Sequence, residues 1–176
     1  MIFHETALAG ARVVELDRKH DERGFFARTW DAEVLRANGL NGDLAQASTA
    51  FNERRGTLRG LHFQRPPYEE AKVVRCTRGA VYDVIVDLRG DSPTFKRWLA
   101  AELTPDNGLM LYVPEGFAHG YLTLVDATET SYFISTPYVP EHADGVRWDD
   151  AAFGIEWPAT PQVIAERDSA WPDFSG

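Results

Sequence analysis

Residues 56–72 are the stretch around which the chain is organised: Gly56-Thr57-Leu58-Arg59-Gly60-Leu61-His62-Phe63-Gln64-Arg65-Pro66-Pro67-Tyr68-Glu69-Glu70-Ala71-Lys72. Much of the stretch suits β-structure, yet it also contains an imidazole, cationic side chains, a carboxylate pair and two glycines. Such groups are costly to bury without partners, and a purely structural strand would not carry so many of them. The stretch therefore predicts β-structure that also forms a binding or proton-transfer site.

Short strands separated by glycine-, proline- and aspartate-rich turns extend in both directions from this stretch. We expect strands at 44–51, 58–64, 71–77, 80–88, 97–103, 109–113, 118–125 and 128–135. An early strand precedes them within residues 1–20, and a polar turn at 21–24 leads into an aromatic strand. This spacing predicts an all-β sandwich or barrel, and the absence of a linker or repeat predicts a single domain over residues 1–176.

Helices are expected only at the periphery. Asp31 is placed to cap a short helix, Ala32 to Asn38, which Gly39 would end. The tail from Trp148 to Gly176 is predicted to wrap around the barrel, with a short helix near 159–167.

Composition excludes several classes of function. The chain of 176 residues has a formal net charge of −9, whereas a general nucleic-acid binder needs a basic face. The single cysteine, Cys76, permits neither an intramolecular disulfide nor a cysteine-based zinc site, and we expect it to be an inert core thiol. The sequence has no secretion signal and no window that resembles a membrane span, so we expect a soluble cytoplasmic protein that contacts no membrane.

Lys72 is a candidate site residue on the basis of strand periodicity alone. It shares a strand face with Val74 and Cys76, so it points into the barrel if that apolar face does. A lysine is almost never fully buried without a partner. The alternative is a lysine at the end of its strand that reaches solvent or forms a structural pair with Glu69 or Glu70.

Several motifs together resemble a known enzyme family. Residues 60–64 with Glu69 and Gly79 resemble the first cupin motif, and residues 114–120 resemble the second. More specifically, segments 58–64, 70–74, 83–89, 92–95 and 116–120 are similar to the dTDP-4-dehydrorhamnose 3,5-epimerase family. The upstream Asp21-x-Arg23-Gly24-x-Phe26, and Trp157-Pro158 with Arg167-Asp168 downstream, extend the similarity from about residue 21 to residue 168.

This resemblance implies a cupin-type jelly-roll β-barrel with a few short peripheral helices, usually a homodimer. It implies inversion of carbon 3, carbon 5 or both on a nucleotide-linked 4-keto-6-deoxyhexose, with no metal or other cofactor. By the same resemblance, His62 is the general base, Asp168 orients it, Tyr132 is the opposing acid and Lys72 lies near the keto oxygen. The residues matched to substrate binding are His119 in the sugar pocket, Arg23 and Arg59 at the pyrophosphate, and Phe26, Gln46 and Tyr138 near sugar or nucleotide.

The chain departs from the family pattern at Arg28, Ser48, Ala50, Phe133 and Ala165. Most of these positions belong to regions that contact the sugar or the nucleotide. They leave the His62, Tyr132 and Asp168 set intact, while the sugar, the base and the number of inverted centres stay open.

Two rival functions remain open on the sequence. A metal-dependent cupin would use His62, Glu69 or Glu70, and His119 as ligands, although Gln64 occupies the usual second histidine position and nearby cations would repel a metal. A non-catalytic sugar-nucleotide binder is the other rival. Individual residues also have structural readings: Arg23 and Arg59 as surface ion pairs, and Phe25, Phe26 and Trp30 as core aromatics.

Overall fold

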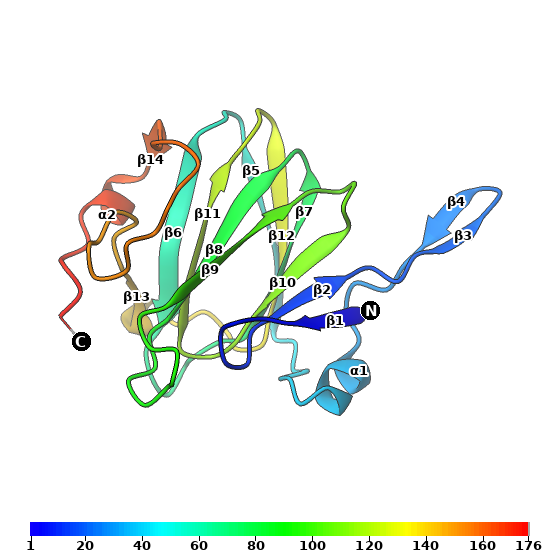
Figure 1. Cartoon of the computed structure of the whole chain (residues 1–176), viewed down its shortest axis with the longest axis horizontal. Coiled ribbons are helices and arrows are strands. Elements are labelled where there is room, and N and C mark those ends of the chain that lie inside the picture. The colour runs from blue at the N-terminus through cyan, green and yellow to red at the C-terminus, as the bar shows by residue number, and fades with distance from the viewer. Residues whose placement is uncertain (176) are drawn as a thin grey trace.

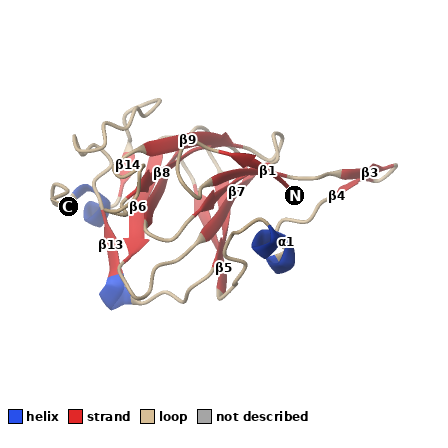
Figure 2. Ribbon diagram, turned by 60° about the horizontal axis from the view of Figure 1, so that its bottom comes forward, coloured by secondary structure: helices blue, strands red, loops and turns tan. Residues whose placement is uncertain are grey.

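Two antiparallel sheets face each other in the computed structural model, which describes residues 1–175 (Figures 1 and 2). The first sheet has the order β1 (Ile2–Glu5), β2 (Arg12–Glu15), β10 (Leu109–Val113), β7 (Lys72–Arg78), β12 (Thr128–Ile134) and β5 (Gln46–Asn52). The second has the order β13 (Ala143–Gly145), β6 (Thr57–Gln64), β11 (Phe117–Thr123), β8 (Val81–Asp87) and β9 (Trp98–Leu103). A short strand, β14 (Val163–Ile164), pairs in parallel with β6.

The main core fills the space between the two sheets. Val74 and Cys76 of the first sheet meet Ile85 and Tyr121 of the second, and all four are almost completely buried. Burial raises the pKa of the Cys76 thiol to about 11, in keeping with the expected inert thiol. The all-β prediction is therefore confirmed.

The outer faces of both sheets are also covered. Helix α1 (Ala32–Ala37) lies over the outer face of the first sheet, where Leu35 packs against Val73 and Met110. The C-terminal segment covers the second sheet, with Val146 and Phe153 in the same cluster as residues of β6, β8 and β11. The tail predicted to wrap around the barrel therefore covers the outer face of one sheet, beside β6 in Figure 1.

A buried carboxylate closes the end of β8. Asp87 is fully buried and accepts hydrogen bonds from the guanidinium of Arg89 at 2.7 and 2.8 Å and from the hydroxyls of Ser92 and Thr94. Burial alone would raise the pKa of this carboxyl, but the four donors outweigh it and lower the pKa to about 2. Asp87 therefore stays charged, and its hydrogen bonds to Arg89, Ser92 and Thr94 stabilise the loop between β8 and β9.

The helices agree only partly with prediction. Asp31 caps α1 by accepting from the backbone N–H groups of Glu33 and Val34, as expected, and Gly39 follows with a φ of +72°. The helix predicted near 159–167 is wrong in position, because α2 spans only Glu166–Ser169. Residues 162 and 163 instead donate their N–H groups to the carbonyl of Gly56, which holds this segment against β6. A 3-10 turn, η1 (Pro140–His142), precedes β13. Within residues 1–175, no helix is long and apolar enough to span a membrane.

A two-stranded arm leaves the body of the molecule. Strands β3 (Lys19–Asp21) and β4 (Gly24–Phe26) pair with each other and project away from both sheets (Figure 1). Phe25 and Phe26 on this arm are 53% and 70% exposed, so the expectation of core aromatics is wrong for both. Trp30 does pack against a core cluster, where its ring lies 5.5 Å from that of Phe133.

Candidate active site

One cavity between the sheets collects most of the predicted catalytic side chains. It has a volume of about 270 Å³ and is lined by Ser48, Arg59, His62, Lys72, His119, Tyr121, Tyr132 and Ile134. His62 and His119 come from neighbouring strands of the second sheet, where they are register partners. Lys72 and Tyr132 come from β7 and β12 of the first sheet. The imidazole of His62 and the phenol of Tyr132 therefore enter one cavity from opposite walls.

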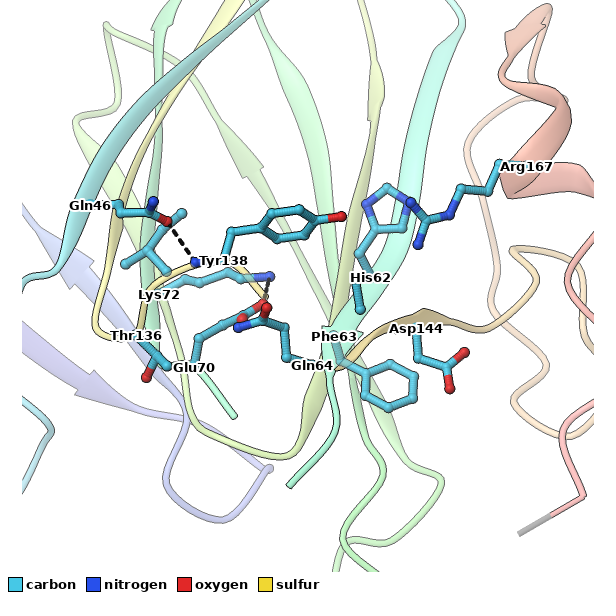
Figure 3. A pocket seen from close by; sticks show the side chains of 12 residues that line it. Gln46, His62, Phe63, Gln64, Glu70, Lys72, Thr136, Tyr138, Asp144 and Arg167 are labelled. Carbon is cyan, nitrogen blue, oxygen red and sulfur yellow. Dashed lines mark hydrogen bonds and ion pairs between the residues drawn. The ribbon is translucent and has the colours of Figure 1, made fainter. Parts of the chain in front are cut away.

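A second cavity of about 320 Å³ adjoins the first and shares His62, Lys72 and Ile134 with it. Gln46 and Tyr138, both predicted to lie near sugar or nucleotide, line this second cavity, and the amide oxygen of Gln46 accepts the N–H of Tyr138 at 3.0 Å. Arg167 of α2 reaches the same space beside His62 (Figure 3). The sequence motif contained Arg167 only as the neighbour of Asp168, so its place in this cavity was not predicted.

His62 is held by a buried aspartate from the far end of the chain. Its Nε2 lies 2.7 Å from Oδ1 of Asp168, and the other carboxylate oxygen accepts the N–H of Gly60 at 3.1 Å. Burial would raise the pKa of Asp168, but the hydrogen bond and charge of His62, with the Gly60 N–H, lower it overall. Because Nε2 is engaged by Asp168, Nδ1 is the ring nitrogen left to act on a substrate.

Lys72 is both inward-facing and paired. Its side chain is 11% exposed, and its Nζ lies 2.8 Å from Oε1 of Glu70, whose side chain is 10% exposed (Figure 3). The inward direction of Lys72 that strand periodicity predicted is therefore confirmed, and so is the alternative that Lys72 pairs with Glu70. The ammonium borders both cavities, so it remains able to meet a ligand there.

A glycine contact brings the two histidine strands together. Gly60 has a φ of +127°, and a Cβ built on it would lie 2.5 Å from the Cα of Gly120. Only two glycines permit this approach between β6 and β11. Beside the contact, Nε2 of His119 lies 2.9 Å from Oδ1 of Asp83, and both side chains are almost completely buried.

Polar side chains that the sequence did not identify surround Tyr132. Its hydroxyl lies 3.0 Å from Oγ1 of Thr130, and its ring meets that of His119 edge to face at 6.1 Å. Burial raises the pKa of Tyr132 well above its usual value, so the phenol is protonated near neutral pH. The only sequence signal for Thr130 was its place two residues from Tyr132 on the same strand face.

The predicted phosphate-binding residues fall in two separate places. Arg59 borders the first cavity and donates from Nε to the amide oxygen of Asn52 at 2.8 Å. Arg23 lies at the tip of the arm, where it pairs with Asp21, and Phe26 lines a hollow near α1. One copy of the chain therefore does not bring Arg23 and Phe26 to the cavity that holds His62.

The arrangement gives little support to the metal-dependent rival. Both histidines use Nε2 to contact aspartates, and Glu70 is committed to Lys72. Gln64 is buried and donates to the backbone carbonyls of Tyr68 and Pro137, which is a structural role. Within residues 1–175, no group of three histidine, cysteine, aspartate or glutamate side chains is arranged to hold a metal ion.

Comparison with known proteins gives one consistent result. The family model described as dTDP-4-dehydrorhamnose 3,5-epimerase matches residues 5–176. Relatives of that name from Sinorhizobium fredii and Methanothermobacter thermautotrophicus are 43% and 40% identical, over 99% and 96% of this chain and 90% and 92% of theirs. The crystal structure of the enzyme of that name from Bacillus anthracis, with TDP and PPi bound, is 39% identical. It covers 98% of this chain and 99% of its own, with a TM-score of 0.94.

The fold, the cavity and these matches over nearly the full length agree with one another. The chain belongs to the dTDP-4-dehydrorhamnose 3,5-epimerase family.

Proposed function

We propose that this protein is an epimerase that inverts the carbons on both sides of the ketone, carbon 3 and carbon 5, in dTDP-4-dehydro-6-deoxy-D-glucose. The observation that carries the proposal is the entry of His62 and Tyr132 into one cavity from opposite sheets. Inversion needs a base on one face of the sugar ring and a proton donor on the other. Two groups on one wall would return the proton to the face it left.

His62 is proposed to remove the proton. A hydrogen on carbon beside a ketone is acidic only because its loss gives an enolate, and each unit of pKa mismatch with an imidazole costs about 1.4 kcal/mol. A base alone cannot meet that cost, so the enolate oxygen must be stabilised. Lys72 is suited to this role, because its side chain is 11% exposed and a fixed charge acts more strongly where it is shielded from water. Asp168 holds the imidazole in one tautomer and stabilises the imidazolium.

Tyr132 is proposed to complete the inversion. The electron pair of the enolate forms a new C–H bond with the phenolic proton on the opposite face, and the O–H bond breaks to leave a phenolate. His62 leaves the step as imidazolium, so the site returns to its starting state when the two groups exchange protons with solvent. A phenol kept protonated by burial is matched to this donor role.

We propose that the protein binds its substrate through a nucleotide diphosphate group. Arg59 lies at the edge of the cavity, and its guanidinium fork suits a phosphate oxygen pair. The Bacillus anthracis relative was solved with TDP and PPi. Gln46 and Tyr138 in the adjoining cavity are proposed to contact the nucleotide or the sugar.

We propose a homodimer in which the arm of one copy serves the site of the other. The arm exposes Phe26 and Arg23 far from their own cavity. Strand β5 forms an edge of the first sheet, contains no charged residue and is exposed over most of its length. Uncharged edge strands favour pairing with another chain. A second copy would cover this edge and would supply the arm residues that one copy alone leaves outside.

Mixed dimers test the exchange of arms. Arg23→Ala and His62→Ala chains are each expected to be inactive as homodimers. Random pairing in co-expressed protein should restore roughly a quarter of wild-type activity, because half of the dimers contain one intact site of two. Activity no higher than that of the separate variants would rule out the exchange. Light scattering that gives a monomer mass would rule out the dimer itself.

Proton NMR of the 4-keto sugar nucleotide in heavy water tests the activity. We expect deuterium at carbons 3 and 5, no exchange with His62→Ala, and exchange without normal inversion with Tyr132→Phe. Binding without exchange would identify a non-catalytic module. Stoichiometric metal tied to turnover would support the metal-dependent rival. Normal inversion by Tyr132→Phe would remove Tyr132 from its proposed role.

A further inference from the structure

A series of buried polar groups lies behind the Tyr132 hydroxyl. Oγ1 of Thr130 lies 3.0 Å from the Tyr132 oxygen and 3.3 Å from the oxygen of Tyr121. The Tyr121 oxygen in turn lies 3.1 Å from Nδ2 of Asn52. Thr130, Tyr121 and Asn52 are between 0% and 3% exposed. These groups are shielded from water, so the hydrogen of each hydroxyl must be assigned within the series.

The orientation of the Asn52 amide is fixed by its neighbours. Its Oδ1 accepts from Nε of Arg59 at 2.8 Å, and a guanidinium can only donate. Its Nδ2 donates to the backbone carbonyl of Thr128 at 3.2 Å, and a carbonyl can only accept. The two ends of the amide are therefore fixed, and Nδ2 faces the oxygen of Tyr121 as a donor.

The remaining hydrogens follow from that assignment. The Tyr121 hydroxyl donates to Oδ1 of Asn52 at 3.4 Å, and its oxygen lies 3.3 Å from Oγ1 of Thr130 as an acceptor. The single hydrogen of Thr130 has three acceptors within reach, and the oxygen of Tyr132 at 3.0 Å is nearer than the oxygen of Tyr121 at 3.3 Å or the carbonyl of Ala50 at 3.5 Å. The hydrogen of Tyr132 is left without a partner in this series and is free to point into the cavity.

We propose that Thr130 is a positioning residue for proton donation by Tyr132, through the hydrogen bond that its hydroxyl donates at 3.0 Å; this rests on the proposed epimerase function. Before the transfer, Thr130 occupies a lone pair of the phenol and turns the phenolic hydrogen toward the sugar. After the Oη–H bond breaks and the C–H bond forms, the same hydroxyl donates to the phenolate. Hydrogen bonds to a charged oxygen are stronger than those to a neutral one, so Thr130 favours the state that follows the transfer.

The surroundings of Tyr132 make this donor valuable. Burial raises the pKa of the phenol, and the hydrogen bond from Thr130 opposes that rise. The titratable and charged groups that line the same cavity or lie against His119 are His62, Lys72, Arg59, Tyr121, His119 and Asp83. The Thr130 hydroxyl donates to the Tyr132 oxygen and lowers the pKa of the phenol, while the neighbouring Tyr121 raises it.

Separating exchange from inversion tests the proposal. Thr130→Val removes the hydroxyl and keeps the shape, and proton exchange by His62 should continue at close to the wild-type rate. The ratio of exchange to inversion should rise about tenfold or more, as expected for the loss of a hydrogen bond to a charged oxygen. Thr130→Ser, which keeps the hydroxyl, should restore the wild-type ratio.

Matched controls exclude a general packing effect. Thr128→Val removes a buried hydroxyl from the same strand, and Tyr112→Phe removes a buried phenol that accepts from Asn41 on the far side of the first sheet. Neither control should change the ratio. An unchanged ratio in folded Thr130→Val would overturn the proposal, as would a failure of Thr130→Ser to restore it.

Two further outcomes are also decisive. If Thr130→Val does not fold, Thr130→Ala removes the same hydroxyl, and a wild-type ratio in folded Thr130→Ala would overturn the proposal. Normal inversion by Tyr132→Phe would instead refute the proposed function. The two failures are therefore distinguishable.

Discussion

Replacing Asp168 by asparagine perturbs the site with almost no change in shape. In the protein, Oδ1 of Asp168 contacts His62 at 2.7 Å while Oδ2 accepts the Gly60 N–H at 3.1 Å. An asparagine oxygen would keep the Gly60 bond, and its NH₂ group would then donate to Nε2 of His62. The imidazole would carry its hydrogen on Nδ1, the nitrogen needed to accept the substrate proton. Asp168→Asn therefore favours the wrong tautomer and also removes the charge that stabilises the imidazolium.

The size of the charge effect can be worked out from the geometry. Two unit charges about 4 Å apart interact by about 4 kcal/mol at an effective dielectric constant of about 20. The His62 side chain is 43% exposed, so solvent screens part of this interaction. A residual effect of about 2 kcal/mol corresponds to a rate loss of about 30-fold. The wrong tautomer adds to this, so we expect exchange at both carbons to fall by at least that factor.

The assay is deuterium incorporation at carbons 3 and 5, followed by proton NMR under saturating substrate. Asp150→Asn is the matched control, because Asp150 is 5% exposed against 4% for Asp168 and accepts backbone N–H groups away from the cavities. The control should exchange normally. Exchange by folded Asp168→Asn within about threefold of wild type would refute the reasoning about tautomer and charge.

Three further predictions concern other parts of the molecule. Lys72→Ala should lower kcat more than it weakens binding in steady-state kinetics, because an enolate is present only during the reaction; the reverse pattern would make Lys72 a binding residue. Asp87→Asn should lower the free energy of unfolding by about 2 kcal/mol near neutral pH, since the folded pKa of about 2 lies below the unfolded value. That difference should disappear as the pH falls from about 4 to about 2, and a constant difference across this window would contradict the assignment. Gly60→Ala should destabilise the fold by about 3 kcal/mol in denaturant titrations, because its Cβ would meet Gly120, whereas Gly154→Ala, with a φ of +60° and open space, should cost only about 1 kcal/mol.

The local pattern of turn residues and alternating apolar residues was sufficient to predict most of the strands. The strands expected at 58–64, 71–77 and 109–113 lie within a residue or two of β6, β7 and β10, because turn residues and apolar alternation act locally. Position in space was harder to predict. The pattern at 21–26 indicated a turn and a strand, yet it contains nothing to say that β3 and β4 pair only with each other and leave the barrel.

The contacts of the site depend on distant pairings that periodicity does not encode. Asp168 reaches His62 across 106 positions of sequence, and only the family resemblance suggested the pair. The segment near 159–167 was predicted as a helix from local composition, but β14 pairs with β6 and confines the helix to four residues. Thr130 had no sequence signal beyond its place on the strand face of Tyr132, and Asn52 had none, because buried hydroxyl and amide groups look like ordinary strand residues until their partners are known.

The close approach of β6 and β11 at Gly60 and Gly120 divides the cavity into a fixed wall and an adjustable one. On the second sheet, backbone lies against backbone, so the spacing of His62 and His119 cannot be retuned by exchanging nearby side chains. On the first sheet, Ser48 is an exposed residue of β5 opposite Tyr132, where a larger or smaller side chain changes the room for a sugar without moving the main chain. Divergence toward new hexoses, by natural drift or by directed evolution, should therefore accumulate on β5 and β12 and spare β6 and β11.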